Sequence, residues 1–514
     1  MLQRVPATLI LAMSALLSRL LGLVRDHLLA SAFGASSGDG IYNLDAYYAA
    51  FRIPDLLYNL LIFGAISAAF IPIFTQYKKS GELKKAWEFA GNMMHLMLIF
   101  VLVVAGVAYL FAPQLAHLVA GGFEGEAFDL TVRLMRIMLL SPIIFTFSAI
   151  FISIQDSFKV FFWRSLAPLF YNLGIIFGVL YFAQDFGVVG VTWGVIIGAL
   201  LQLIVQLPAL KSVGYKHVWL LDSKRSDVRE AFKLIVPRVV GLSLSQITLV
   251  VNTLIASFLM TGSITIFYFA DNLQAVPLGI IGISFAITSF ATLSELAMEK
   301  TPSAFVTEIR RVGQQVLFLI IPATLGMLFL RARIIDVILV AGKFTASDAA
   351  VLGAVLSFLL MSLFAQSLIP LFSRGFYAYH NTKTPVITAI VGSIVSVGGS
   401  YLLAIVNGMG VVGIGIAFSA GSILNFVLLY ILMCQKCEGR IFDWLNVFKM
   451  VFAGGVMYST LYLASDYVSY GERLIDRMGS LALLTLVGMV TYFLASRILK
   501  IPELRMIAPG TGSQ

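Results

Sequence analysis

The chain has 514 residues, of which 59% are hydrophobic and only 12% are charged. Soluble domains carry about a quarter charged residues, so these proportions exclude a soluble fold, a disordered chain and a coiled coil. The formal net charge is +9, but the basic excess lies in short loops between apolar runs. That distribution indicates membrane topology rather than a surface for nucleic acid.

Apolar windows long enough to cross a hydrocarbon core recur along the whole chain. Since one crossing takes about 20 residues, they predict an all-α polytopic membrane protein with about 14 transmembrane helices. The first window carries Arg19, Arg25 and Asp26 and lacks a cleavage site, so we expect it to stay as a span rather than act as a signal peptide. The predicted spans are 7–34, 44–77, 86–113, 127–155, 163–184, 188–209, 230–260, 264–297, 307–330, 348–378, 384–406, 410–433, 446–468 and 477–499.

Lysine and arginine gather in alternate loops. They follow the second, sixth and twelfth predicted spans, beginning at Lys78, Lys211 and Lys436, and they end the chain after Arg497. Short cytoplasmic loops are rich in these residues, so we expect these loops and both termini to face the cytoplasm. An even number of spans fits that orientation.

An internal repeat links the sixth and twelfth spans. The sequence Gly-Val-Val-Gly at 187–190 recurs at 410–413, and at the same shift Gly198 meets Gly421. A weaker similarity pairs 28–31 with 254–257, which places the first span over the seventh. Repeats of this kind build many transporters. We therefore predict two six-helix lobes, 1–210 and 211–433, followed by 434–514 with two extra carboxy-terminal helices and a cytoplasmic tail.

Ionisable and amide side chains inside the predicted spans are the candidate functional residues. Each costs several kcal/mol at membrane depth unless it meets a partner or water. Those of the second span fall on one helical stripe, which cannot all face lipid. The candidates are Arg19, Arg25 and Asp26 in the first span, Asp45, Arg52, Asp55 and Asn59 in the second, Arg238 and Asn252 in the seventh, and Asp271 and Asn272 in the eighth.

Two interpretations of these residues stay open. In the first, the charges only pair within a packed bundle, Arg19 with Asp26 and Arg52 with Asp45 or Asp55. In the second, they line a polar cavity between the lobes, where arginines hold an anionic substrate because their planar donors match phosphate oxygens. We favour the cavity for the arginines of the first two spans. Separately, Arg133 and Arg136 near the end of the fourth span are expected to reach lipid headgroups.

Several segments resemble the signature of one transporter family. They include Ser18-Arg19-Leu20-Leu21-Gly22-Leu23-Val24-Arg25-Asp26, Leu44-Asp45-Ala46-Tyr47, Phe51-Arg52-Ile53-Pro54, Phe269-Ala270-Asp271 and Gly342-Lys343-Phe344-Thr345. Together with Gly64-Ala65-Ile66-Ser67 and Gly375-Phe376-Tyr377, these closely resemble the MurJ (MviN) lipid II flippases of the MOP exporter superfamily. The resemblance covers nearly the whole chain. The fourteen helices of that family, arranged as two six-helix lobes and an extra pair, agree with the span count above.

The resemblance implies that the protein moves the undecaprenyl-pyrophosphate-linked peptidoglycan precursor, lipid II, from the inner to the outer leaflet by alternating access. It implies a monomer in the bacterial cytoplasmic (inner) membrane that serves cell wall biogenesis and cell shape, contacts membrane lipids and is not an enzyme. No cofactor, metal or nucleic acid is expected, and the coupling ion, or use of the membrane potential, is left open. Cys434 and Cys437 are taken as incidental because one C-x-x-C cannot complete a zinc site.

Family positions carry over residue by residue. The essential arginines of the first helix correspond to Arg19 and Arg25, the acidic positions to Asp26 and Asp45, and a basic position before a proline to Arg52. The chain departs from the family at three other positions, where Arg, Glu and Arg are common in the family and Tyr58, Phe63 and Asn272 stand here. We expect Arg52 and Arg238 to compensate for the missing cations.

Alternative functions come from different classes. One is a flippase for another polyprenyl-linked glycan, and another is a MATE-like drug or ion antiporter of the same superfamily. The antiporter predicts a cavity dominated by acidic residues, whereas the predicted spans hold arginines at least as prominently. A membrane enzyme acting on a polyprenyl-linked sugar would need clustered carboxylates in the loops, and the sequence offers no such cluster.

Overall fold

The computed structural model describes residues 7–36, 40, 43–59, 65–299, 302–437, 439–471 and 473–506, apart from the side chains at 7–12, 65–68, 236–245, 302 and 506. All regular elements in these ranges are helices. The earlier helices are α1 (Ala7–Phe33), α2 (Leu44–Leu57), α3 (Ala65–Lys79), α4 (Leu83–Leu110), α5 (Ala112–Ala120), α6 (Gly125–Met138), α7 (Leu140–Ser157), α8 (Phe162–Phe186), α9 (Val188–Ile204), α10 (Leu207–Ser212) and α11 (Ser226–Ser257).

The later helices follow the same apolar pattern. They are α12 (Ser263–Pro277), the π-helical segment η4 (Leu278–Ile283), α13 (Ser284–Met298), α14 (Pro302–Ile338), α15 (Ala346–Met361), α16 (Leu363–Ala378), α17 (Lys383–Ser400), the π-helical segment η5 (Tyr401–Val406), α18 (Gly410–Lys436), α19 (Trp444–Ser465), α20 (Leu474–Ile498) and the short 3₁₀ helix η6 (Pro502–Met506).

Ten helical segments in the described ranges are long and apolar enough to cross a membrane, and the pair α15 and α16, bent by 41°, makes an eleventh. The prediction of an all-α polytopic membrane protein is therefore confirmed, whereas the count of fourteen stays a prediction. The three other predicted spans, 7–34, 44–77 and 230–260, coincide with α1, with α2 and α3, and with α11. Of these helices, α1 carries Arg19, Arg25 and Asp26, and α2 and α3 have only 14 and 15 residues.

By packing, the chain divides into two units. The first unit comprises residues 1–265 and 341–345, and the second comprises 266–340 and 346–514. The lobes predicted from the repeat, 1–210 and 211–433 followed by 434–514, divide the chain differently, because α11 belongs by packing to the first unit. Packing and internal homology are separate properties, and the repeat boundaries stay a prediction.

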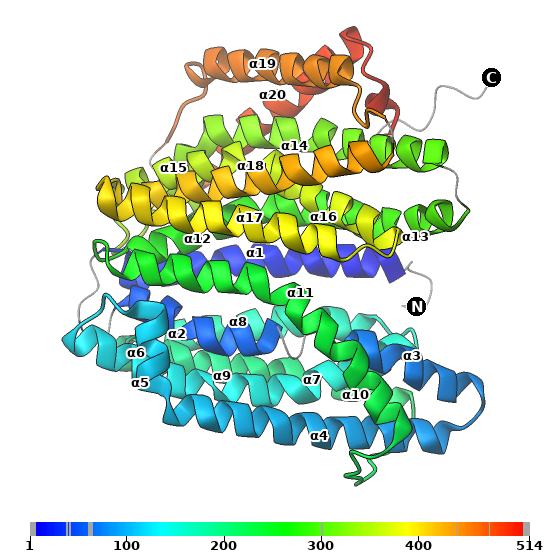
Figure 1. Ribbon diagram of the computed structural model, residues 1–514. Helices are drawn as coiled ribbons and strands as arrows, with labels where there is room; N and C mark the ends of the chain where they lie inside the picture. The colour runs from blue at the N-terminus through cyan, green and yellow to red at the C-terminus, as the bar shows by residue number, and fades with distance from the viewer. Residues whose placement is uncertain are drawn as a thin grey trace. The chain divides into compact units, whose positions relative to one another are not determined.

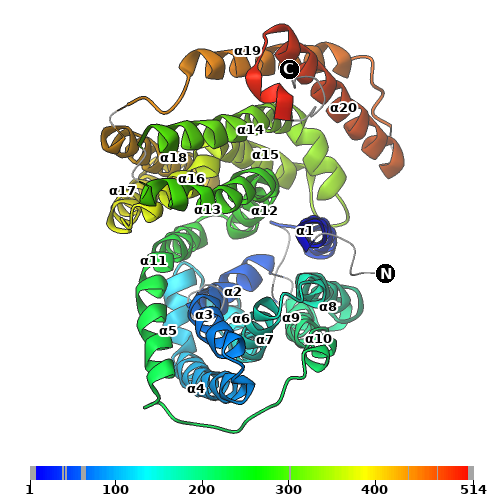
Figure 2. The same ribbon diagram turned by 90° about the vertical axis from the view of Figure 1, so that its right-hand side faces the viewer.

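Close glycine contacts organise the first unit. Helices α8 and α9 run side by side (Figures 1 and 2) and meet through two small-xxx-small pairs, Gly174 with Gly178 and Gly194 with Gly198. A Cβ on Gly174 would lie 2.2 Å from the Cα of Gly198, so only glycine allows this approach. Such contacts associate helices in a bilayer, where the hydrophobic effect gives no drive for one helix to join another.

The two repeated glycine motifs have the same local geometry. Gly187 immediately precedes α9, and Gly410 is the first residue of α18; their φ angles of 57° and 60° are a left-handed conformation that favours glycine. Three residues later, Gly190 and Gly413 each abut the backbone of the preceding span, at Phe182 and at Leu403 and Ala404. In both units these glycines turn the chain back tightly, and α17 runs beside α18 as α8 runs beside α9 (Figure 1).

The segment after α10 packs against α4 and is hydrogen-bonded to it. A Cβ on Gly91 would lie 2.1 Å from the Val218 carbonyl oxygen, so the segment touches the helix backbone there. The Asn92 amide donates to the Asp222 carbonyl and accepts from the Asp222 amide, both at 2.8 Å. This reciprocal pair fixes the segment that leads from α10 to α11.

Candidate functional site

A line of polar contacts joins α1 to α8 in the first unit. The Ser14 hydroxyl donates to Ser165 at 3.0 Å, and the Asn172 amide donates to the Ser18 carbonyl at 3.3 Å. Further along, Arg25 Nη1 donates to Asn172 Oδ1 at 3.1 Å. The three α1 residues lie at i, i+4 and i+11 and therefore share one helical face. We call this line of contacts the α1–α8 seam.

Arg25 is held by its sequence neighbour. Its Nε and Nη2 donate to one Asp26 oxygen at 3.0 and 2.8 Å, while Nη1 reaches Asn172. Asp26 is buried, with only 3% of its surface exposed. The packing interpretation had paired Asp26 with Arg19, whereas the structure gives it Arg25. In this structure Asp26 neutralises the charge of Arg25. For Arg25 to bind an anion, at least one of its hydrogen bonds to Asp26 would have to break.

Arg52 contacts a hydroxyl rather than a carboxylate. Its Nε donates to Thr253 Oγ1 at 2.8 Å, which connects α2 with α11. It forms no ion pair with any residue that the structure describes. Arg52 therefore forms no direct ion pair with Asp45 or Asp55 in this structure, although its charge acts on Asp55. The reason is local, because Asp45 is already bound elsewhere and Asp55 faces a cavity.

The Asp45 carboxylate binds backbone amides at the start of α12. It accepts hydrogen bonds from the Gly262 and Thr265 amides, each at 2.7 Å, and from the Thr265 hydroxyl. Gly262 has φ of 94°, and a Cβ there would lie 2.9 Å from the Ala35 backbone. Asp45 is 2% exposed. A carboxylate with several donors satisfies the unpaired amides where α12 begins, which assigns it a structural contribution at this place.

A cavity of about 370 Å³ opens inside the first unit between α1, α2, α7 and α8. We call it the N-terminal cavity. Its lining combines polar groups from Ser14, Asp55, Tyr58, Arg164 and Tyr171 with aromatic and proline side chains. Of the eleven predicted residues only Asp55 lines it. The α1–α8 seam continues from its wall, since Ser14 and Ser165 are lining residues.

Arg164 is a cation that the sequence analysis missed. It forms an ion pair with Asp156 across the turn between α7 and α8, and about a third of its side chain is exposed. It lines the same cavity as Tyr58. The available signal was an arginine just inside the predicted span 163–184, opposite the acidic end of the preceding span.

The asparagine side chains of the first unit differ in whether their polar atoms form hydrogen bonds. Asn59 donates to the Asp55 backbone carbonyl at 3.0 Å. Asn252 is 1% exposed, and neither its Oδ1 nor its Nδ2 has a hydrogen-bond partner among the described residues. A buried amide without partners costs about 1–3 kcal/mol, so Asn252 has a reason to be there other than stability.

Asp271, a predicted residue of the second unit, belongs to a chain of hydrogen-bonded polar side chains. Asp271 accepts from the Gln274 amide at 2.9 Å, Gln274 accepts from Gln366 at 3.2 Å, and Gln366 donates to Ser362 at 2.9 Å. Ser362 then contacts Ser419 at 3.0 Å. The adjacent Asn272 is half-buried. These contacts join α12, α16 and α18.

Two other residues named in the sequence analysis, Arg238 and Phe63, have side chains that the structure does not describe. The Arg238 side chain lies outside the described residues, although its backbone belongs to α11. Phe63 lies outside them entirely. Arg19 is half-buried on α1, directly after Ser18. The structure thus groups Arg25, Asp26 and Asn172 in one place and Asp55 with Arg164 in another.

An apolar slot of about 300 Å³ lies beside α19 in the second unit. Leu317 and Ile321 of α14, Phe426 of α18, and Trp444 and Val451 of α19 line it. Thr324 supplies the one side-chain hydroxyl among its lining residues. We call this space the α19 slot, and its chemistry suits a hydrocarbon chain.

The family model described as "Lipid II flippase MurJ" matches residues 29–489. The chain belongs to the MurJ family. Curated MurJ proteins agree along nearly the whole length. The probable lipid II flippase MurJ of Thermotoga maritima is 29% identical over 500 residues, covering 97% of this chain and 98% of the relative. That of Vibrio cholerae is 31% identical over 437 residues, covering 82% and 81%.

The fold of this chain is similar to that of solved transporter structures. A lipid II flippase MurJ in an inward closed conformation superposes with a TM-score of 0.79 at 24% identity, covering 96% of this chain and 98% of the other. An inward-facing MATE family multidrug resistance transporter gives 0.68 at 17% identity, covering 82% and 94%. These similarities establish the fold. The MATE protein matches less of this chain than MurJ does.

Proposed function

We propose that this protein moves lipid II from the inner to the outer leaflet of the bacterial cytoplasmic membrane by alternating access. The observation that carries the proposal is the family match across residues 29–489. A flippase must shield a charged headgroup from hydrocarbon while its polyprenyl tail stays in lipid. The polar lining of the N-terminal cavity suits the headgroup, and the apolar lining of the α19 slot suits the tail.

The headgroup is assigned to the first unit. Guanidinium groups suit a pyrophosphate because they stay charged in a low dielectric and offer parallel donors. Arg52 has its terminal nitrogens without described partners, and Arg164 adds a cation near Tyr58. Arg25 would join them by exchanging part of its contact with Asp26. This set of contacts supports pyrophosphate binding by Arg25, Arg52 and Arg164, with Arg19 and Arg238 as further predicted contributors.

The tail is assigned to the α19 slot. Apolar side chains from four helices, α14, α16, α18 and α19, line it, and α19 and α20 lie outside the predicted repeat. A prenyl chain gains roughly 25 cal/mol for each Å² of apolar surface that it buries in such a groove. Retaining the tail there would keep the headgroup near the protein during transfer.

The proposal extends to energetics and topology. The membrane potential supplies about 2.3 kcal/mol per charge per 100 mV, enough to bias the transfer of a charged headgroup without ATP. We propose that the protein acts as a monomer without cofactor, with both termini in the cytoplasm. The basic loops at Lys78, Lys211 and Lys436 support this orientation.

The decisive experiment measures cargo transfer directly. The chain is reconstituted into proteoliposomes with fluorescent lipid II, and accessibility to an impermeant quencher is followed. We expect faster equilibration between leaflets than in empty vesicles, together with rescue of a flippase-depleted bacterium. Good expression without rescue, combined with transfer of a polyprenyl pyrophosphate bearing another glycan, would assign a different cargo.

Topology has an independent test, because the chain contains only two cysteines, Cys434 and Cys437. Replacing both by serine gives a background for single cysteines at Lys79 and at Arg473. An impermeant maleimide added to intact cells stripped of outer membrane should label position 473 and spare position 79. The reverse pattern would overturn the proposed orientation.

A further inference from the structure

The largest cavity described in the first unit lies apart from the sites above. It is a groove of about 670 Å³ bounded by the last turns of α4, by α6 and by the start of α7. None of its lining residues lines the N-terminal cavity. Leu102 and Leu140 are 46% and 43% exposed, so the groove opens on the outer face of the helices, where a bilayer would surround them.

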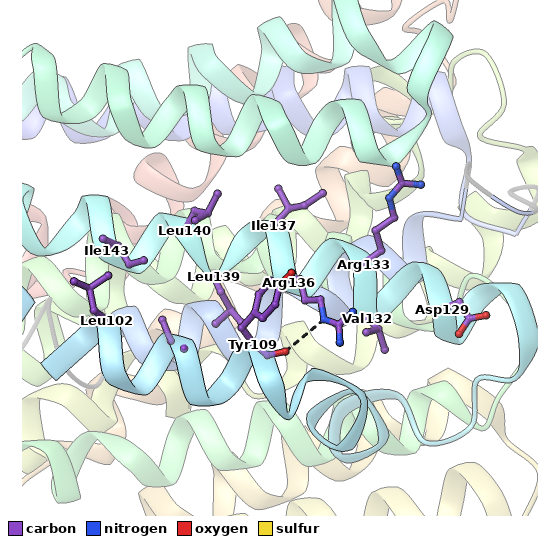
Figure 3. A pocket seen from close by; sticks show the side chains of 12 residues that line it. Leu102, Tyr109, Asp129, Val132, Arg133, Arg136, Ile137, Leu139, Leu140 and Ile143 are labelled. Atoms are coloured by element: carbon purple, nitrogen blue, oxygen red, sulfur yellow. Dashed lines mark hydrogen bonds between the residues drawn. The ribbon is translucent and has the colours of Figure 1, made fainter. Parts of the chain in front are cut away.

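The groove changes character along its length. Figure 3 shows Leu102, Ile143 and Leu140 toward one end and Arg136, Arg133 and Asp129 toward the other. Residues 137–155 carry no charge and match the roughly 20 residues that cross a hydrocarbon core. The arginines therefore stand just beyond that stretch, at the level of headgroups, while the apolar row runs along the hydrocarbon.

Both arginines have guanidinium N–H groups that bind no described residue. Arg136 lies over the Tyr109 ring, 5.2 Å from its centroid, and its Nε donates to the Tyr109 carbonyl at 3.4 Å. This contact orients the guanidinium and leaves its two terminal nitrogens without a partner among the described residues. Arg133 is exposed and has no hydrogen bond or ion pair to a described residue. Arg136 is thus oriented by Tyr109, and Arg133, one turn earlier on α6, adds a second, exposed cation that can bind phosphate.

We propose that this groove binds one anionic membrane phospholipid. Its phosphodiester would contact Arg133 and Arg136, and one acyl chain would lie against Leu102, Leu140 and Ile143. The net charge of the lining is positive, because two arginines oppose the single carboxylate of Asp129. That balance matches a headgroup with one negative charge and selects phosphatidylglycerol over phosphatidylcholine. Polar contacts and apolar contacts lie at the two ends of the groove, as they do in a lipid.

The polar end is tested with the full-length protein in detergent, titrated with phosphatidylglycerol and examined by native mass spectrometry. We expect Arg133→Gln combined with Arg136→Gln to lower the retained phosphatidylglycerol at least fivefold. The matched control is Arg331→Gln, which removes an exposed arginine at the end of α14 and should leave retention unchanged. Equal retention of phosphatidylcholine by the native protein, or undiminished phosphatidylglycerol in the double variant, would overturn the proposal.

The apolar end has its own variant. Gly106 lines the groove, and a Cβ there meets nothing within 4 Å, so Gly106→Phe introduces a side chain whose first atom is unobstructed. Retention should fall although both arginines remain. Gly455→Phe on α19 is the control, because Gly455 also has open space and lies far from this groove in sequence. Unchanged binding in Gly106→Phe would exclude the acyl-chain contact.

Competition separates the phospholipid from the cargo. Adding undecaprenyl phosphate at the same concentration should displace little of the bound phosphatidylglycerol, since the groove is expected to select a lipid with two acyl chains at an interface. Displacement by undecaprenyl phosphate at lower concentration than phosphatidylglycerol itself would overturn the assignment and make the groove a cargo site. The lipid measurement does not depend on transport, so its failure would leave the proposed flippase function unaffected.

Discussion

The two units share a way of turning the chain but differ in what they bury. Both begin a helix with a left-handed glycine, Gly187 or Gly410, and both press the glycine three residues later against the preceding span. Inside the first unit the polar contacts include a buried ion pair, Arg25–Asp26, beside neutral contacts such as Gln155 with Gln206. Inside the second, the contacts from Gln274 to Ser419 pass through amides and hydroxyls.

The difference shows that helix packing and site chemistry are specified by separate residues. Glycines set how closely helices approach, and they need the same geometry in either unit. The side chains between the helices then decide whether a space suits a phosphate or a hydrocarbon. The N-terminal cavity holds Asp55 and Arg164, whereas the α19 slot is almost entirely apolar. A lipid-linked substrate needs both environments.

The largest effect is expected from removing the charge of Arg25. Arg25→Gln leaves the Asp26 carboxylate buried without its ion-pair partner, which costs about 3–5 kcal/mol. We expect a large drop in the unfolding temperature and complete loss of lipid II transfer in proteoliposomes. Both are measured on the same detergent-purified protein.

A double variant separates packing from transport. Arg25→Gln with Asp26→Asn removes both charges of this ion pair, so its stability should return toward that of the native protein. Transfer should stay absent because the cation is still missing. Recovery of transfer together with stability would show that the pair serves only to pack α1.

The α19 slot gives the next largest effect. Val451→Trp fills the slot, and we expect transfer of lipid II with its full tail to slow about tenfold, on the order of 1.4 kcal/mol. An analogue with a tail of a few isoprene units should be unaffected. Val490→Trp on the exposed face of α20 is the matched control. Equal slowing of both substrates would argue against a tail site.

Asn252 tests whether a buried amide is kept for function. Asn252→Leu removes two unpaired polar atoms, so we expect a gain of about 1 kcal/mol in stability with slower transfer. Asn92→Leu is the contrast, because it breaks a reciprocal pair with Asp222 and should destabilise by about 1–3 kcal/mol. Thermal unfolding compares the two. Unimpaired transfer in Asn252→Leu would remove Asn252 from the site.

The smallest effect concerns pH at the start of α11. Burial alone would raise the pKa of Asp227, but hydrogen bonds and charge from Arg225, with a donor from Tyr77, lower it below its ordinary value. Because the folded pKa is depressed, the stabilisation is present above about pH 4 and is lost as pH falls through the folded value.

The corresponding variant is Asp227→Asn. At pH 7 it should be less stable by about 1 kcal/mol or less, since Arg225 is partly exposed, and near pH 3 the two proteins should converge. Glu230→Gln, an exposed carboxylate without an ion pair among the described residues, should match the native protein at both values. A constant difference across that range would show that the carboxylate charge is not what stabilises this end.

Several features could be predicted from the sequence because they depend on neighbours along the chain. Apolar windows predicted the spans, and the recurrence of Gly-Val-Val-Gly predicted two similar turns. The stripe on α2 predicted that its polar residues avoid lipid. Partner choice could not be predicted in this way. Asp45 has Arg52 two turns away in sequence but accepts hydrogen bonds from Gly262 and Thr265.

By itself, the sequence determined that the chain is a helical membrane protein, that its charged residues concentrate in a few spans, and that its motifs are those of MurJ. Only the tertiary structure decided that Arg25 is compensated by Asp26, that Arg164 enters the N-terminal cavity beside Tyr58, and that Asn252 is left without described partners. The physical reason is the distance along the chain over which each property is determined. Hydropathy and helical periodicity act within a few turns, whereas an ion pair or cavity depends on which helices meet and at what rotation.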